Sequence, residues 1–217
     1  MINGTPANIT LNNDAGDCSA VASWTAPTAA DNCAIATFTS THNSGDAFAV
    51  GTTTVTYTAT DIHSNTTTST FTVTVTDNEQ PVISGLPSDI TQTADAGECE
   101  ADVTWTAPTA ADNCAIATFT STASPGDAFP EGMTTVTYTA TDIHGNSSTG
   151  SFTITVTDDE DPAISGTPAN ITQSNDAGNC SAAVSWTAPT ASDNCGVASL
   201  TATHAIGSVF AVGTTTV

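Results

Sequence analysis

The stretch "GTTTVTYTATDIHSNTTTSTFTVTVTD", residues 51–77, carries the clearest structural signal in the chain. Its first part alternates Thr with Val, Tyr and Ala, and its last part alternates Thr with Phe and Val. This period of two, in β-branched and aromatic residues, predicts strands at 52–60 and 69–77 that each bury one face. Threonine forms strands well, so it can occupy the open face without adding charge. The turn signal "DIHSN" (61–65) separates the two strands.

Shorter strand signals precede this stretch. The segments "ANITL" (7–11), "AVASW" (20–24) and "AIATFTST" (34–41) each predict a further strand, and turn signals rich in Asn, Asp, Gly and Pro lie between them. No segment shows a helical period. Several short strands in about 80 residues predict an all-β fold, an antiparallel β-sandwich of immunoglobulin type.

The chain repeats itself every 81 residues. The segment "WTAPTAADNCAIATFTST" fills 24–41 and 105–122, and a third version, "WTAPTASDNCGVASLTAT", fills 186–203. A constant register without insertions predicts tandem domains arranged as beads on a string, at 1–81, 82–162 and 163–217. The third would lack its last strands. We expect the chain to be a window from a longer array; the alternative is a natural third domain with an exposed sheet edge.

The composition restricts the classes of partner. The 217 residues include no Lys or Arg and 22 acids, for a net charge of −22, and 38% are hydrophobic, enough for a packed core. Such a chain cannot neutralise phosphates, so nucleic acid and anionic membrane surfaces are not expected partners. Without lysine it can form no Schiff base, P-loop or Lys–Asn isopeptide bond. No run of 18 apolar residues exists, so this segment is not expected to insert into a membrane.

Six cysteines, two per repeat, indicate disulfides and an oxidising compartment, and hence a secreted or cell-surface location. They allow 15 connectivities. Because a tandem array favours the local solution, we predict the pairs Cys18–Cys33, Cys99–Cys114 and Cys180–Cys195. Zinc is the alternative, but a repeat offers two cysteines and no adjacent histidine, whereas zinc usually takes four ligands.

Three motifs resemble the hyalin repeat (HYR) family of immunoglobulin-like modules. They are "WTAPTAADNC" (24–33), "GTTTVTYTATDIHSN" (51–65) and "FTVTVTDNEQP" (71–81), and with their copies they cover essentially the whole chain. The resemblance implies long tandem arrays in extracellular proteins, adhesins of bacterial surfaces among them, and an adhesive or structural role. Many members carry a third cysteine before the last strand's Phe, where this chain has Thr70 and Ser151. That departure supports the local pairing.

The acids are expected to gather where repeats meet. If strands alternate in direction, the "TAADNC" loop and the "DIHSN" turn face the previous domain, and the "NNDAGDC" loop faces the next. The linkers should then approach the following domain's loops and form Ca²⁺ sites, since Ca²⁺ takes six to eight oxygen ligands. The alternative is turn capping, for which Asp31 and Asp61 are candidates. The candidate ligands are Asp77, Asn78, Glu79, Asp112, Asn113, Asp142, Asp158, Glu160, Asp193 and Asn194.

Other side chains have simpler interpretations. Trp24, Trp105 and Trp186 are expected in the core, with sugar stacking as the alternative. The four histidines are expected to be solvated. The sequons at Asn8, Asn65, Asn146 and Asn170 are candidate glycosylation sites, and exposed threonines could carry O-linked sugar.

The repetition argues against an enzyme. Every acidic pair recurs at the same register, whereas an active site is normally a single constellation, and no nucleophile–base arrangement is present. We therefore expect a structural segment of a long adhesin, stalk or filament, with domains stacked end to end. Its expected partners are neighbouring repeats, other copies in a fibre, and glycans. The alternative is a carbohydrate- or protein-binding accessory module of a secreted protein.

Overall fold

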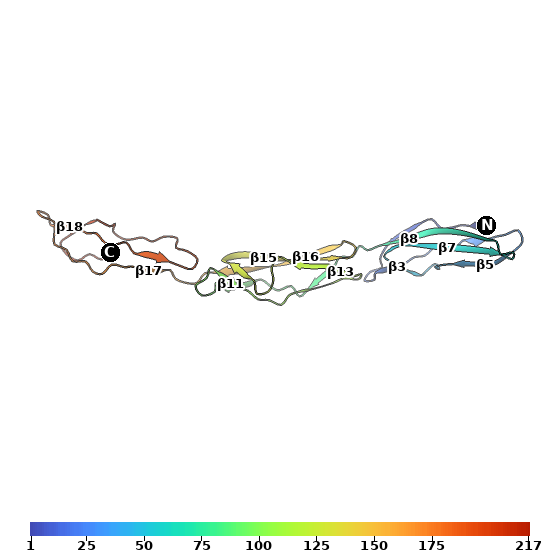
Figure 1. Cartoon of the computed structure of the whole chain (residues 1–217), viewed down its shortest axis with the longest axis horizontal. Helices are drawn as coiled ribbons and strands as arrows, with labels where there is room; N and C mark the ends of the chain where they lie inside the picture. The colour runs from blue at the N-terminus through green and yellow to red at the C-terminus, as the bar shows by residue number, and fades with distance from the viewer. The chain divides into compact units, whose positions relative to one another are not determined.

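The computed structural model describes residues 1–217 and contains strands and loops only (Figure 1). The predicted all-β fold class is confirmed. No helix long and apolar enough to cross a membrane is present.

Each of the first two repeats has eight strands. In the first repeat they are β1 (Ile2–Asn3), β2 (Ile9–Asn12), β3 (Ser19–Val21), β4 (Thr28–Ala29), β5 (Ile35–Ser40), β6 (Ala47–Ala49), β7 (Gly51–Asp61) and β8 (Thr66–Thr76). In the second they are β9 (Val82–Ser84), β10 (Ile90–Thr93), β11 (Glu100–Asp102), β12 (Thr109–Ala111), β13 (Ile116–Ser121), β14 (Ala128–Pro130), β15 (Gly132–Asp142) and β16 (Ser147–Thr157).

The main sheet of the first repeat has the order β2-β8-β7-β5, and that of the second has the matching order β10-β16-β15-β13. Strands β7 and β8 form an antiparallel hairpin that runs from Gly51 opposite Val75 to Thr60 opposite Thr66. Strand β2 is the exception to the expected antiparallel pattern, because it pairs with β8 in parallel. The rest of the repeat separates these two strands, so a long crossover connects them, as parallel pairing requires.

The core of the first repeat lies between this sheet and two short strand pairs, β3–β6 and β1–β4. The alternation predicted from sequence is observed at 55–59 in β7 and at 71–75 in β8, where every second residue is buried and the threonines between them are more open. The buried core cluster consists of Ala20, Ala22, Phe48, Val55, Tyr57, Phe71, Val73 and Val75. Burial of each large apolar side chain contributes roughly 1.5–3 kcal/mol.

The third repeat has four short strands: β17 (Ala163–Ser165), β18 (Ser181–Ala183), β19 (Thr190–Ser192) and β20 (Val209–Ala211). They pair as β17–β19 and β18–β20. The segment 169–172, "ANIT", matches part of β2 but forms no strand. Its pairing partner would be the counterpart of β8, which the 217 residues do not include. The backbone N–H and C=O groups of this segment therefore have no neighbouring strand with which to form hydrogen bonds.

The chain divides into two compact units that do not coincide with the repeats. One comprises Met1–Leu86, Ala107–Thr122 and Thr137–Ser151, and the other comprises Pro87–Thr106, Ala123–Val136 and Phe152–Val217. Each unit contains one junction: residues 76–81 with the loops they meet lie in the first, and residues 157–162 with theirs lie in the second.

Candidate functional site at the junctions between repeats

Two disulfides join cysteines of successive repeats. Cys18 is bonded to Cys114, and Cys99 to Cys195, each pair with Cα atoms 4.7 Å apart and a sequence separation of 96. Cys33 and Cys180 are free and exposed. The local pairs Cys18–Cys33, Cys99–Cys114 and Cys180–Cys195 were therefore a wrong prediction.

The geometry of a single repeat explains this correction. Cys18 lies at the open end of the β7–β8 hairpin, where its carbonyl accepts a hydrogen bond from the Val50 amide. Cys33 lies at the turn end, where the neighbouring Ala34 carbonyl accepts from the Ile62 amide. Strand β7 separates these two ends by about 34 Å, whereas a disulfide needs Cα atoms within about 7 Å. Cys18 can therefore reach only the next repeat.

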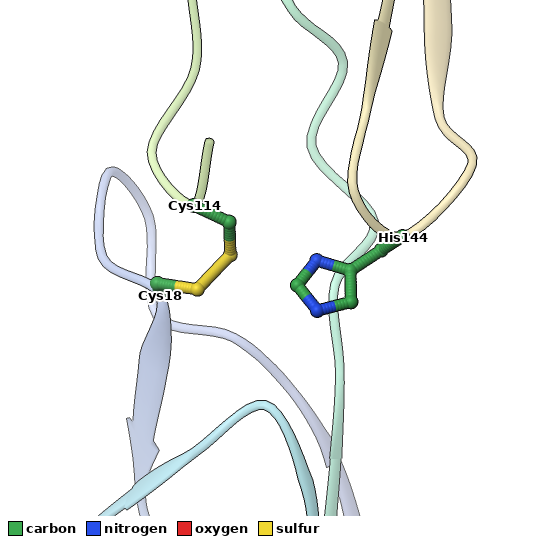
Figure 2. Close-up of side chains that lie close together, drawn as sticks. All are labelled: Cys18, Cys114 and His144. Atoms are coloured by element: carbon green, nitrogen blue, oxygen red, sulfur yellow. A yellow bond between two sulfur atoms is a disulfide. The ribbon is translucent and has the colours of Figure 1, made fainter. Parts of the chain in front are cut away.

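Asp77 occupies the centre of the first junction. Its side chain is fully buried, and its Oδ2 lies 3.0 Å from Nδ1 of His144 in the second repeat. Its Oδ1 accepts a hydrogen bond from the Glu79 amide, and its carbonyl accepts one from Nδ2 of Asn146. Figure 2 shows the His144 ring pointing from its hairpin toward the Cys18–Cys114 disulfide. The linker is thus held by the β15–β16 turn.

Asp142 organises that turn. It is 2% exposed; its Oδ1 accepts the amides of His144 at 2.7 Å and Asn146 at 2.9 Å, and its Oδ2 accepts the Asn146 side chain at 2.8 Å. Burial alone would raise the pKa of Asp142, but these hydrogen bonds outweigh it and hold the pKa below 3.8. The carboxylate therefore stays ionised although it is buried.

The matching acids of the first repeat are simple turn caps. Asp61 accepts the amides of His63 and Asn65 and the Asn65 side chain, and these bonds lower the pKa of Asp61. Asp31 accepts the Cys33 amide at 3.0 Å. The capping interpretation is confirmed for both residues.

Asp112 and Asn113 bring buried oxygens without hydrogen-bond partners to the first junction. Asp112 caps the Cys114 amide through Oδ2 at 2.9 Å, and Asn113 donates through Nδ2 to the Asp17 carbonyl at 3.0 Å. Both remaining oxygens, Oδ1 of Asp112 and Oδ1 of Asn113, are buried and unpartnered. The amide orientation of Asn113 is fixed, because a flip would place its oxygen against the Asp17 carbonyl.

These acids lie close enough to repel one another. A carboxylate oxygen of Asp77 lies within 4.8 Å of one from Asp112, and likewise within 4.8 Å of one from Asp142. At an effective dielectric constant of about 20, each such pair of charges repels by roughly 3 kcal/mol. His144 is the nearest basic group, in a chain without Lys or Arg.

The second junction repeats part of this arrangement. Nδ2 of Asn194 donates to the Glu98 carbonyl at 2.7 Å and to Oδ1 of Asp158 at 3.3 Å, and its Oδ1 is buried and unpartnered. Oδ1 of Asp193 caps the amides of Cys195 and Gly196. The 217 residues include no counterparts of Asp142 and His144 at this junction.

Three predicted ligands make hydrogen bonds within their own repeats. Oε1 of Glu79 accepts the Gly16 amide at 2.8 Å, and Oε1 of Glu160 accepts the Gly97 amide at 2.7 Å. Each glutamate thus fastens its linker to a loop of its own repeat. Asn78 is exposed and donates its backbone amide to Asn13. Metal binding by these three residues stays a prediction.

Two further expectations concern this junction. His144 is exposed as a residue, as expected, but its side chain, which is 27% exposed, also contacts Asp77. Nδ2 of Asn146, the atom that would carry a glycan, already donates to Asp142 and to Asp77. Nδ2 of Asn65 likewise donates to Asp61, whereas Asn8 and Asn170 are exposed. Glycosylation stays a prediction for all four residues. The contact of His144 was not predicted. The sequence signal for it was the spacing Asp142–His144–Asn146, which places the histidine in the capped turn.

The tryptophans were expected in the core; they are half-buried and pack on phenylalanines at its edge. Trp24 contacts Phe48 and Phe71 with ring centroids 5.9 and 5.1 Å apart, and its Nε1 donates to the Tyr57 hydroxyl at 2.8 Å. Trp105 packs in the same way on Phe129 and Phe152, and Trp186 packs on Phe210.

These features define a tandem array of small all-β modules that are bonded covalently from one repeat to the next. The HYR domain family matches residues 2–75, 76–156 and 157–217. The chain therefore belongs to the HYR domain family, and the resemblance noted from sequence is confirmed. The family matches begin about six residues before the repeat boundaries chosen here, which remain a prediction.

Similar proteins include two called hyalin. The chain is 43% identical over 213 residues to hyalin of Lytechinus variegatus, covering 95% of this chain and 40% of that protein. It is 40% identical over 202 residues to hyalin of Strongylocentrotus purpuratus, covering 89% of this chain and 17% of that protein. The chain thus spans less than half the length of either relative. Among solved structures, protocadherin gamma B7 cadherin domains 1–4 align over 84% of this chain and 56% of that one, with 17% identity and a TM-score of 0.31.

Proposed function

We propose that this chain is a structural segment of an extracellular, adhesion-type protein in which successive repeats are fastened end to end. The observation that carries the proposal is the pair of disulfides, Cys18–Cys114 and Cys99–Cys195, each joining neighbouring repeats. A disulfide between adjacent domains restricts their relative motion. The primary partners of each repeat are then its neighbours in the same chain, and other copies in a fibre and glycans are the further partners proposed.

An extracellular location fits the chemistry of the chain. Disulfides persist in oxidising compartments and are rare in the cytosol. The similarity to the two hyalins, over 95% and 89% of this chain, supports the same class of protein.

A non-enzymatic role agrees with the arrangement of the acids. The clustered carboxylates cap turns, hold linkers or face one another, and the turn chemistry of Asp61 recurs at Asp142. The alternative, a carbohydrate-binding accessory module, would need exposed aromatic platforms. The three tryptophans instead pack against phenylalanines, so the structural role has the better support.

Small-angle X-ray scattering tests the proposal on the whole chain. The double variant Cys18→Ser/Cys114→Ser should keep the wild-type circular dichroism but show a broader distribution of interatomic distances, because the first junction is released. The matched control is Cys33→Ser, which removes a free cysteine and should scatter as wild type does. Superimposable curves for the double variant and wild type would contradict the proposal, and binding to a glycan array would favour the accessory module.

A further inference from the structure

We infer that Glu131 protects the disulfide of the second junction, Cys99–Cys195, against reduction by small anionic thiols. Its carboxylate repels the negatively charged thiolate that attacks the bond. The inference rests on the structural role proposed above, because protection of this bond matters only if the bond holds two repeats together.

Glu131 lies directly beside the sulfur atoms of the second disulfide. Its Oε2 is 4.0 Å from Sγ of Cys99, and a carboxylate oxygen of Glu131 and both sulfurs all lie within 4.8 Å of one another. The contact is not a hydrogen bond, because a sulfur in a disulfide carries no proton to donate. With no Lys or Arg in the chain, neither of these side chains can offset the charge next to the bond.

The carboxylate is specific to the second repeat. Val50 and Val212 stand at the same register as Glu131, and in all three repeats the backbone amide of this residue donates to the carbonyl of the nearby cysteine. Val50 packs against the core of the first repeat, whereas Glu131 is exposed. The exchange of valine for glutamate therefore keeps the backbone bond and changes the charge beside the sulfurs.

The chemistry of reduction explains why this charge matters. A thiolate attacks one sulfur of the disulfide, a bond forms between the reagent and that sulfur, and the Cys99–Cys195 bond breaks. The departing sulfur leaves as a thiolate and takes a proton from water. A second thiolate then attacks the mixed disulfide, so that two reagent thiols are oxidised to one disulfide and the protein disulfide is reduced to two thiols. Both attacks bring a negative charge close to Glu131.

The distance sets the size of the effect. Glu131 is exposed, so water screens its charge. Repulsion between two unit charges about 4 Å apart in water slows a reaction by about fivefold. A thiol with a second negative charge, such as 2-mercaptoethanesulfonate, is slowed further, and a cationic thiol such as cysteamine is slowed least. High salt weakens the repulsion, because the Debye length falls to about 3 Å at 1 M.

The first disulfide has a different environment. A ring nitrogen of His144 lies within 4.8 Å of both its sulfurs (Figure 2), and carboxylates of Asp77 and Asp112 approach Sγ of Cys114. Because a histidine and two acids occur together there, the two disulfides differ in more than one charge. The effect of Glu131 is therefore measured on its own bond across variants, while the first disulfide reports any general effect of net charge.

Rates of thiol exchange in the whole oxidised chain test the inference. The chain is incubated with 2-mercaptoethanesulfonate at low salt and quenched with iodoacetamide, and mass spectrometry of its peptides follows each disulfide separately. Glu131→Gln should speed opening of the second disulfide by about fivefold and leave the first unchanged. The matched control Asp102→Asn removes the same charge from β11, at a residue outside the cluster of Glu131 with the sulfurs, and should react as wild type does.

The reciprocal variant Val50→Glu should slow opening of the first disulfide by a similar factor, with the circular dichroism of wild type. Equal rates for Glu131→Gln and wild type would overturn the inference. The same follows if the gain persists in 1 M NaCl, is as large with cysteamine, or is matched by Asp102→Asn. Intact disulfides with equal rates would refute the protective role alone, whereas a wild-type chain without the second disulfide before thiol is added would refute the structural proposal.

Discussion

Asp142 and Asp61 show how burial changes the consequence of one local motif. Both cap the same turn with the same hydrogen bonds, but Asp142 is 2% exposed because the preceding linker covers it. The capping role could be predicted from the "TDIHSN" and "TDIHGN" sequences, since Asp and Asn favour such turns. The burial could not, because it depends on a linker that is distant in sequence.

The lowered pKa of Asp142 predicts a pH-dependent contribution to stability. Its folded pKa lies below 3.8, so the stabilisation is complete above that pH and is lost as pH falls through the folded pKa. At pH 7 with chelator present, Asp142→Asn should destabilise its unit by about 1–3 kcal/mol, because buried donors lose their charged acceptor. Thermal melting between pH 7 and pH 2 should show the difference from wild type shrinking below about pH 3.8. A difference that stays constant down to pH 2 would contradict this assignment.

At the scale of elements, the two long strands of each repeat could be predicted because their period of two is continuous over many residues. The two-residue strand β4 lies inside "APTAADN", which reads as a turn, and its pairing with β1 could not be predicted. The parallel direction of β2 was missed as well. Periodicity identifies a buried face but carries no information about strand direction.

Two residues that contact each other both differ between the first and second repeats, and the two changes offset each other in size. In the first repeat Thr5 and Ser69 share a hydrogen bond of 2.7 Å between their hydroxyls. In the second, Leu86 and Gly150 take those positions, and a Cβ on Gly150 would collide with Cδ1 of Leu86. The large side chain of Leu86 therefore occupies space that is left open because Gly150, on β16, has no side chain.

This pair predicts coupling between the two positions. Gly150→Ser should destabilise the wild-type chain by at most about 1 kcal/mol, because Leu86 is 36% exposed and its side chain can rotate away from the added Cβ. In a Leu86→Thr background the same change should be more favourable by about 0.5–1 kcal/mol, since it recreates the pair of the first repeat. Urea unfolding of the four proteins in the double-mutant cycle measures this coupling energy. Additive effects would show that the two positions do not interact.

At the scale of the whole molecule, the disulfide connectivity could not be read from the repeat. Cys33 and Cys114 are the same position of successive repeats, so an 81-residue period fits a bond from Cys18 to either one. The predicted placement of the loops at opposite ends of a repeat already argues against a Cys18–Cys33 bond, because it separates these two cysteines by the length of β7. The tandem array was predictable, whereas the bonds across its junctions needed three-dimensional distances.

The connectivity predicts a distinct labelling pattern. Iodoacetamide applied to the unfolded but unreduced chain should modify Cys33 and Cys180 only. Cleavage at acidic residues, in a chain without tryptic sites, should then release disulfide-linked peptides that contain Cys18 with Cys114 and Cys99 with Cys195. Mass spectrometry that finds no modified cysteine, or a Cys18–Cys33 peptide, would contradict the structure.

The staggered disulfides also determine how the chain would respond to tension. Pulled from its two ends, the oxidised chain transmits force along residues 1–18, crosses to Cys114, runs back to Cys99, crosses to Cys195 and continues to 217. Even fully unravelled, this path reaches only about 200 Å, against about 760 Å for the reduced chain. The middle repeat contributes only residues 99–114 to the tensile path, and most of its two long strands is shielded from the pull. Reduction would therefore increase the maximum length of the tether about fourfold.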